Sequence, residues 1–455
     1  MGKMNKRITA VTATAVLAGG LLLQGCGGQK GEGPVKIELG FYHFEAMSPT
    51  KELYEGLVED FQEKYPRISV NNMEYAESGA SYNSKLLTMS AASTPPDVFE
   101  IITVDLMEFV KRGVVLNLDD YIEKSGQIDL DDWYAEIVDA FRFDGEVCGK
   151  GSLYGLPKDW SGLLNPYYNR KLFDEAGVPY PDESWSWEEL LEASKKLTKR
   201  AGNGRALQFG GGIGRDLLRV SCLMYQNGGS VFTPDGKKCV LDSDESIEAY
   251  EFLIEDMVHE ARCVPDISEA GTQSAEDMFM TGRLGMIFEG RYKSPVLEDK
   301  IKDFEWGVGP SLHRKKRANI VVPCGFSVSS RSPRPEEAFR FLEFIAGPVG
   351  AARNAKLGWN IPAIKSIAES ELFLTNPGHP EGINRVFLED AKYAISYPSS
   401  KYIAFSRLTN IVSRQVGLAY LGKKTVREAL VKAAKEVNEV IAGNIEKEEK
   451  EKNKR

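Results

Sequence analysis

The chain has 455 residues, of which 42% are hydrophobic and 27% charged, and its formal net charge is −9. That length is enough for two or three domains, and the composition is that of an ordinary globular protein. Nucleic-acid affinity comes mainly from neutralising phosphates with basic side chains, so the acidic balance argues against a nucleic-acid partner.

The first 25 residues read as a signal peptide. Lys3, Lys6 and Arg7 precede an uncharged apolar run over 8–23, which is typical of a secretory signal. That run is shorter than the roughly 20 residues a membrane-spanning helix needs. An uncleaved membrane anchor is the alternative.

Leu-Gln-Gly-Cys at 23–26 resembles the lipobox of bacterial lipoproteins. The resemblance implies cleavage before Cys26 and attachment of fatty acyl chains such as palmitate to Cys26. The protein would then be anchored on the extracellular side of the bacterial cell membrane. The glycine-rich residues 26–34 are expected to form a flexible tether.

Strand and helix patterns alternate from residue 35 onward. Residues 35–41 alternate apolar and polar side chains, as a half-buried strand does. Residues 51–65 place their apolar side chains on one helical face, and 68–70 begin another extended run. Strand, helix and strand in such a short span predict an α/β fold with parallel strands.

The alternation continues to residue 441. Two capping boxes, Ser186–Glu189 and Thr425–Glu428, mark the starts of helices. Residues 446–455 are almost all charged, which predicts a disordered tail over 442–455. The other predicted elements are a buried strand at 97–102 and helices at 106–112, 247–258 and 335–346.

Local signatures of catalysis are missing. The four histidines form no i, i+4 pair, and no Cys-x-x-Cys occurs among the five cysteines after Cys26. No metal site or cofactor is therefore predicted. The glycine-rich stretch 210–216 has Arg215 where a dinucleotide fingerprint needs its third glycine, so it predicts a loop at a strand end. The chain is expected not to be an enzyme. A glycosidase is the alternative, because folding could bring two of its many carboxylates together.

Several stretches, in this order and spacing, resemble the extracellular solute-binding proteins of bacterial ABC importers, in particular the sugar-binding family that includes maltose-binding protein. The resemblance runs from about residue 35 to 441. It rests on LVEDFQEKYPRISV (57–70), PPDVFEIITVDLMEFVKRGVVLNLDDYI (95–122), YGLPKDWSGLLNPYYNRKLFDEAGVPYPDESWSWEELLEASKKL (154–197), FMTGRLGMIFEGRY (279–292), AFRFLEFIAGP (338–348) and WNIPA (359–363).

The resemblance implies two α/β lobes in the type II periplasmic-binding-protein-like fold, with ligand bound in a cleft that closes about a hinge. The chain would cross between the lobes near Asp159, Gly309 and Gly350. The implied lobes are 35–159 with 310–349 and 160–309 with 350–441. Open α/β sheets bind ligands beyond the carboxyl ends of their strands, which independently places the site there.

Candidate ligand-binding residues follow from that placement. A sugar offers hydroxyl groups and apolar C–H faces, so it should meet planar polar side chains and aromatic rings. Gly290 and Gly325 are included because they allow a close backbone approach. The full set is Glu45, Glu77, Asp105, Asp159, Trp160, Gly290, Arg291, Tyr292, Gly325 and Trp359.

The resemblance implies a monomeric, membrane-tethered carbohydrate-binding protein that delivers sugar to the permease subunits of an ABC transporter. A sensory lipoprotein that signals sugar occupancy to a receptor is the first alternative. A surface glycosidase is the second.

Overall fold

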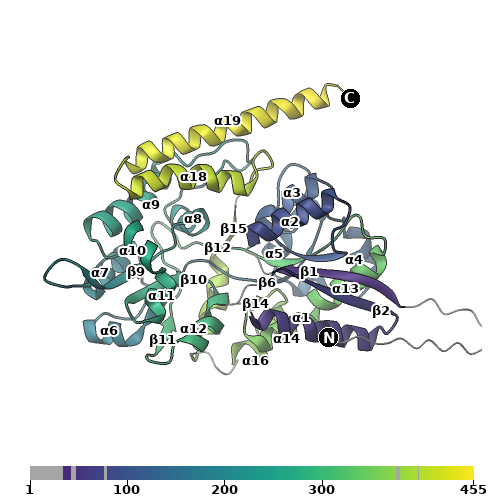
Figure 1. The fold of residues 1–455 in the computed structure, drawn as a ribbon, viewed down its shortest axis with the longest axis horizontal. Helices are drawn as coiled ribbons and strands as arrows, with labels where there is room; N and C mark the ends of the chain where they lie inside the picture. The colour runs from purple at the N-terminus through teal and green to yellow at the C-terminus, as the bar shows by residue number, and fades with distance from the viewer. Residues whose placement is uncertain (1–33, 43–47, 76–78, 376–379, 398, 455) are drawn as a thin grey trace, which may run out of the picture.

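The computed structural model describes residues 34–42, 48–75, 79–375, 380–397 and 399–454 (Figure 1). The expected signal peptide, Cys26, Glu45 and Glu77 lie outside these ranges. Within them, no helix combines the length and the apolar character needed to cross a membrane. The described chain forms two lobes, each built around one β-sheet (Figure 1).

The first lobe is built on a six-stranded mixed sheet in the order β14-β6-β13-β3-β1-β2. The strand expected at 35–41 is β1, in which Ile37, Leu39 and Phe41 face the core. It pairs in parallel with β2 and β3, whereas β13 and β14 run antiparallel to their neighbours. The strands are β1 (Val35–Tyr42), β2 (Ile68–Tyr75), β3 (Val98–Ile102), β6 (Leu156–Trp160), β13 (Cys324–Val328) and β14 (Ile361–Pro362).

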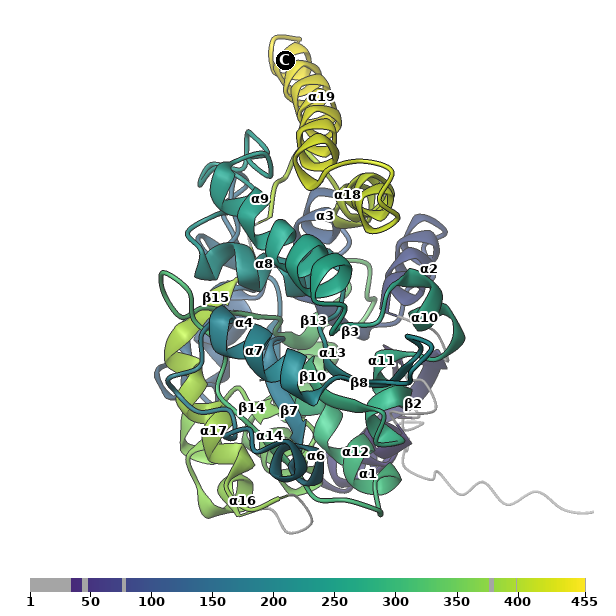
Figure 2. The same ribbon diagram turned by 90° about the vertical axis from the view of Figure 1, so that its left-hand side faces the viewer.

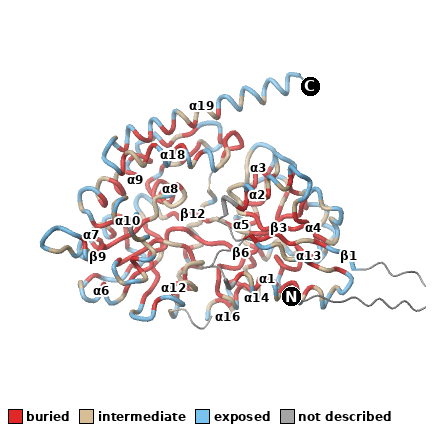
Figure 3. The backbone as a smooth tube through the Cα atoms, in the orientation of Figure 1, coloured by how far each residue is buried: buried red, intermediate tan, exposed pale blue. Residues whose placement is uncertain are grey.

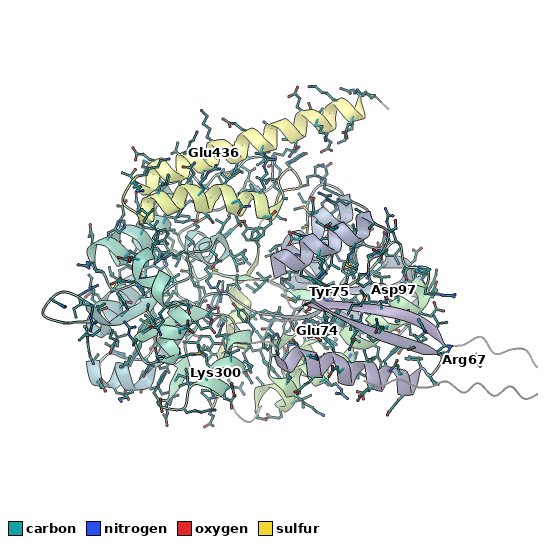
Figure 4. The ribbon with its side chains drawn as sticks, viewed as in Figure 1. Arg67, Glu74, Tyr75, Asp97, Lys300 and Glu436 are labelled. Carbon is teal, nitrogen blue, oxygen red and sulfur yellow. The ribbon has the colours of Figure 1, made fainter. Side chains whose placement is uncertain are left out.

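Helices α1 and α13 pack against each other beside this sheet. The Phe61 ring of α1 lies 4.9 Å from the Phe341 ring and 5.4 Å from the Phe344 ring of α13. Asp97, just before β3, accepts hydrogen bonds from the Glu38 amide and the Ser332 hydroxyl, which links β1 to the segment after β13 (Figure 4). The helices are α1 (Ser48–Lys64), α2 (Gly79–Ala91), α3 (Leu106–Lys111), α4 (Asp119–Ser125), α5 (Ala135–Asp139), α13 (Pro335–Ala346) and α14 (Pro348–Leu357). A small hairpin, β4 (Arg142–Phe143) and β5 (Ser152–Leu153), follows α5.

The second lobe is built on a five-stranded sheet in the order β11-β7-β10-β9-β8. Its strands are β7 (Asn165–Asn169), β8 (Lys199–Arg200), β9 (Ala206–Gly212), β10 (Leu284–Glu289) and β11 (Trp306–Val308). Its helices are α6 (Arg170–Ala176), α7 (Trp187–Leu197), α8 (Leu217–Gln226), α9 (Asp244–Glu251), the π-helix η4 (Phe252–Glu260), α10 (Ile267–Thr272), α11 (Ala275–Met280), the 3₁₀ helix η5 (Arg291–Lys293), α12 (Ser294–Lys300), α18 (Phe405–Tyr420) and α19 (Val426–Lys452).

The chain passes between the sheets through short segments. The first crossing lies between β6 and β7, and the second between β11 and β13, where β12 (Asn319–Val321) pairs in parallel with β15 (Ala394–Ser396). Beyond the boundary at 349 that the resemblance implies, α14 and β14 still lie with the first sheet, since β14 pairs with β6. Three short helices, α15 (Lys365–Ala368), α16 (Glu371–Leu374) and α17 (Ile383–Asp390), lead back to the second lobe.

A buried polar network joins these crossing segments. Asn319 Oδ1 accepts the amide hydrogens of Leu163 and Leu164, each at 3.0 Å. Asn319 Nδ2 and Asn165 Nδ2 both donate to Asp390 Oδ2, at 2.9 Å and 3.2 Å. Because the three side chains come from the start of β7, from β12 and from α17, these bonds fix the segments between the lobes relative to one another.

The capping boxes expected at Ser186 and Thr425 are both formed and open α7 and α19. Helix α19 continues to Lys452, where the sequence predicts a disordered tail. Ion pairs spaced by four residues, Glu446–Lys450 and Glu448–Lys452, stabilise this end of the helix. Figure 2 shows α19 standing out from the second lobe, and Figure 3 shows its last turns exposed. Glu436 accepts hydrogen bonds from Arg414 and Gln415 and so ties α19 to α18 (Figure 4).

Candidate functional site

A cavity of about 360 Å³ lies between the lobes. Its first-lobe wall comes from the ends of β3 and β6, the start of β13 and the residues before β14. Its second-lobe wall comes from α8, η5, α12 and the start of α18. The cavity therefore lies at the carboxyl ends of β3 and β6, where α/β sheets bind ligands. We call it the front cavity.

A buried charge cluster forms the base of the front cavity. Lys158 Nζ lies 2.6 Å from Glu100 Oε1 and 3.5 Å from Asp159 Oδ2. Tyr54 Oη accepts a hydrogen bond from Lys158 Nζ at 2.7 Å and donates one to Glu100 Oε1 at 3.0 Å. Burial raises the pKa of both carboxyls, whereas the two carboxylates outweigh burial and raise the pKa of Lys158 well above its usual value. The lysine therefore stays protonated and holds the carboxylates in place.

Asp159 holds two amide side chains, of which Asn360 lines the front cavity. Its Oδ1 accepts a hydrogen bond from Asn360 Nδ2, and its Oδ2 accepts one from Asn354 Nδ2, both at 3.1 Å. The buried Asn360 Oδ1 has no hydrogen-bond partner among the described residues. Because a buried unpaired acceptor is costly, a ligand hydroxyl that donates to this oxygen would bind favourably.

Asp105 follows β3 and lines the same cavity. Burial raises the pKa of its carboxyl, and the hydrogen bond from Asn83 Nδ2 opposes that shift. Asn83 Oδ1 is also buried and lacks a hydrogen-bond partner among the described residues. The end of β3 therefore presents a second pair of polar groups to a ligand.

The second lobe contributes an arginine held in a fixed orientation. Asp216 caps α8, and its carboxylate accepts from the Arg219 amide and from Arg219 Nη1. Arg219 Nη2 pairs with Glu289 and donates to Tyr292 Oη at 2.9 Å, and Tyr292 Oη donates to Glu289 at 2.8 Å. Burial and the Glu289 carboxylate raise the pKa of Tyr292 well above its usual value, so its hydroxyl stays protonated.

Aromatic and apolar side chains complete the front cavity. Trp359, Tyr292 and Phe405 lie in its wall, and Trp359 is only 5% exposed. Planar polar groups beside aromatic surfaces suit a ligand that has both hydroxyl groups and apolar faces. The other lining residues are Ile102, Val104, Ser161, Leu163, Leu218, Lys293, Val296, Val322 and Cys324.

The structure gathers Asp105, Asp159, Tyr292 and Trp359 in the front cavity. Trp160 packs edge-on against Tyr134 instead, with 5.6 Å between ring centroids, and it does not line the cavity. The remaining described candidates, Gly290, Arg291 and Gly325, do not line it either.

Arg291 and the two glycines make close contacts within the protein, away from the front cavity. Arg291 is fully buried and its Nε donates to Asn384 Oδ1 at 2.6 Å. Gly290 accepts a hydrogen bond from Tyr167 Oη at 2.8 Å, and a Cβ there would lie 2.6 Å from the Gly162 carbonyl oxygen. A Cβ at Gly325 would lie 2.8 Å from the Pro157 backbone, so this glycine lets β13 approach β6 closely.

Sequence reasoning did not select several cavity residues that the description above depends on, among them Asn83, Glu100, Lys158, Arg219, Asn360 and Phe405. Lys158 adjoins the selected Asp159, and Glu100 lies in the recognised strand before Asp105, so proximity to strand ends could have found both. Arg219 follows the glycine-rich stretch that we interpreted only as a loop. No local sequence pattern marks Asn83 or Phe405 as a site residue.

The described residues show no group of three or more His, Cys, Asp or Glu side chains that could hold a metal ion. The carboxylates in and beside the front cavity are paired with lysine, arginine, tyrosine or amide groups. These pairings hold polar side chains in fixed positions from which they can orient a ligand.

Three comparisons place the chain among known proteins. Residues 48–352 match the sequence family described as bacterial extracellular solute-binding protein. A putative binding protein of Brucella abortus is 24% identical over 359 residues, which cover 78% of this chain and 82% of that protein. An uncharacterised lipoprotein of Streptomyces antibioticus is 26% identical over 369 residues, which cover 79% of this chain and 76% of that protein.

The structure is similar to that of an ABC substrate-binding protein from Listeria monocytogenes, solved in complex with cycloalternan. The TM-score is 0.79 at 26% sequence identity, and the match covers 90% of this chain and 99% of the Listeria chain. The two-lobed periplasmic-binding-protein-like fold predicted from the sequence is therefore confirmed.

Proposed function

Because the chain belongs to the family of bacterial extracellular solute-binding proteins, we propose that it binds a sugar or oligosaccharide outside the cell. It delivers this ligand to the permease subunits of an ABC transporter and performs no chemistry on it. The protein acts as a monomer.

The front cavity carries this proposal. Asn360, Asp105 and Arg219 offer planar hydrogen-bonding groups from both lobes, and Trp359 and Tyr292 offer aromatic surfaces between them. Sugars need both kinds of contact, since their hydroxyls hydrogen-bond and their C–H faces stack. The complex of the similar Listeria protein with cycloalternan supports this choice of ligand.

Cys26 supports a location at the outer face of the cell membrane. Its lipobox-like context and the glycine-rich stretch after it favour a lipid anchor with a tether. The similar Streptomyces protein is described as a lipoprotein. Tethering raises the effective concentration of the binding protein at its permease.

A thermal-shift screen tests the proposal. A ligand that binds only the folded state stabilises it by about 2.7 kcal/mol when present at a hundred times its Kd. Neutral mono- and oligosaccharides should raise the melting temperature, with amino acids and short peptides as the comparison set. Stabilisation by peptides alone would refute a carbohydrate ligand, and release of smaller sugars during incubation would establish the glycosidase alternative.

A further inference from the structure

Every cation that lines the front cavity contacts a carboxylate of the protein. Three basic side chains line it: Lys158, Arg219 and Lys293. Lys158 Nζ lies within ion-pair distance of the Glu100 and Asp159 carboxylates. It also donates to the Tyr54 hydroxyl, and an ammonium group has three N–H groups in all. Lys158 therefore has no N–H group left for a ligand.

Arg219 has little donor capacity left. Its Nη1 donates to Asp216 Oδ2 at 2.8 Å, and its Nε donates to the Phe288 carbonyl oxygen at 3.4 Å. Its Nη2 donates to the Glu289 carboxylate and to the Tyr292 hydroxyl. A guanidinium has five N–H groups, so these bonds use four of them. Because two carboxylates contact this guanidinium, the protein itself neutralises its charge.

Lys293 is the lining cation with the most donor capacity left. Its Nζ lies 2.7 Å from Glu276 Oε2, and no other described residue accepts a hydrogen bond from this ammonium. Lys293 belongs to η5 in the wall of the cavity, whereas Glu276 belongs to α11 and does not line it. Glu276 therefore neutralises, from outside the cavity, the lining cation best able to pair with an anionic ligand.

A carboxylate without a counter-ion adds to this balance. Asp105 lines the cavity and accepts a hydrogen bond from Asn83, but it forms no ion pair with any described cation. Like charges repel strongly in a poorly hydrated site, because the low local dielectric screens them little. A carboxylate or phosphate on the ligand would meet this repulsion, and it would lose its own hydration without gaining a counter-ion.

We infer that Glu276 is a specificity-determining residue, which keeps Lys293 paired and so makes the front cavity reject acidic saccharides such as uronates and sugar phosphates. This inference rests on the proposed function and specifies its ligand class, a saccharide without an acidic group. Glu276 acts through Lys293, and Asp105 adds direct repulsion.

Calorimetry on the full chain tests the inference with saccharides of one to four hexose units. Each saccharide is used in three forms, in which C6 of every unit is the natural hydroxymethyl group, a carboxylate or a carboxamide. The carboxamide matches the carboxylate in shape and carries no charge, so comparing these two forms isolates the effect of charge. In the wild type, Kd should be at least tenfold higher for the carboxylate than for the carboxamide.

Glu276→Gln leaves Lys293 without a carboxylate partner and keeps the volume of the side chain. It should lower the Kd of the carboxylate form about tenfold and leave that of the hydroxymethyl form within twofold of wild type. The double variant Glu276→Gln/Lys293→Met should lose this gain, because Lys293 supplies the counter-ion. Glu192→Gln is the matched control, since Glu192 pairs with Lys195 at 2.9 Å on α7 and its replacement changes the net charge equally. It should leave the carboxylate Kd within twofold of wild type.

Several results would overturn the inference while leaving the proposed function standing. In the wild type, these are equal affinity for the carboxylate and the carboxamide, or rejection of both while the hydroxymethyl form binds. In the variants, they are an unchanged carboxylate Kd in Glu276→Gln, a gain that survives in the double variant, or an equal gain in Glu192→Gln. Failure of every form to bind would instead remove the proposed function.

Discussion

Replacing Lys158 with methionine should strongly destabilise the folded chain at neutral and alkaline pH. The Lys158, Glu100 and Asp159 side chains are at most 7% exposed, and the lysine supplies the positive charge that both carboxylates contact. Methionine occupies a similar volume without a charge, so Lys158→Met leaves two buried carboxylates without a cation. Removing one partner of a buried ion pair costs about 3–5 kcal/mol.

The destabilisation caused by Lys158→Met should increase with pH. Burial raises the pKa of Glu100 and Asp159, and loss of the lysine would raise both further. A carboxyl whose pKa is higher in the folded than in the unfolded chain destabilises the folded state above its unfolded pKa, about 4. This cost grows with pH until the folded pKa is passed. Lys158→Met should therefore lose most stability near pH 8 and recover part of it near pH 5.

Thermal unfolding at pH 5 and pH 8 measures the effect. A melting temperature falls by roughly 2–4 °C per kcal/mol for domains of 150–250 residues, so we expect a decrease of about 6–20 °C at pH 8. The second substitution in Lys158→Met/Glu100→Gln removes one unpaired charge and should restore part of the loss. Lys195→Met is the control, because Lys195 is 44% exposed and its pairing with Glu192 contributes less than about 1 kcal/mol. An equal decrease at both pH values would refute the electrostatic argument.

Three further results are expected. Trp359→Ala should weaken sugar binding by about ten- to a hundredfold in calorimetry, since a buried aromatic surface contributes roughly 1–3 kcal/mol, while Trp160→Phe should leave affinity within twofold. Saturating sugar should lower the radius of gyration in small-angle scattering, and identical curves would indicate a receptor that is already closed. Cys26→Ala should abolish incorporation of a fatty-acid analogue without changing sugar affinity; a wild type that takes up no label would exclude the lipoprotein assignment.

Local signals predicted most of the secondary structure. The alternation at 35–41, the capping boxes at Ser186 and Thr425, and the proline and glycine that bound α13 each depend on neighbouring residues, so the sequence displays them directly. The end of α19 differs from expectation because composition alone suggested disorder. Its i, i+4 ion pairs and the contact of Glu448 with Lys401 depend on spacing and on tertiary packing.

The front cavity was predictable where a residue follows a strand or lies in a segment that resembles the family. Asp105 follows β3, so the rule that ligands bind at strand ends selected it. Asp159 was selected because the family resemblance implies a crossing between the lobes there. Arg219 lines the cavity because Glu289, seventy positions later in the chain, fixes its guanidinium, and no local pattern reports that partnership. Arg291 was selected because it lies in the family-like segment 279–292. Its guanidinium instead donates a hydrogen bond to Asn384 inside the protein.

The distribution of charge explains how the front cavity could bind a neutral ligand. In the front cavity, buried charges are paired with each other, so they orient amide and hydroxyl groups without requiring a charged ligand. The ion pairs that join the lobes lie outside the front cavity, at Lys401, whose Nζ contacts Glu146 and Glu448. Ion pairs outside the cavity can join the lobes after the ligand has entered, because forming these pairs does not remove water from the ligand. Lobe closure and ligand recognition therefore use separate sets of residues, and substitutions at Lys401 should alter the closing equilibrium without altering which sugar is preferred.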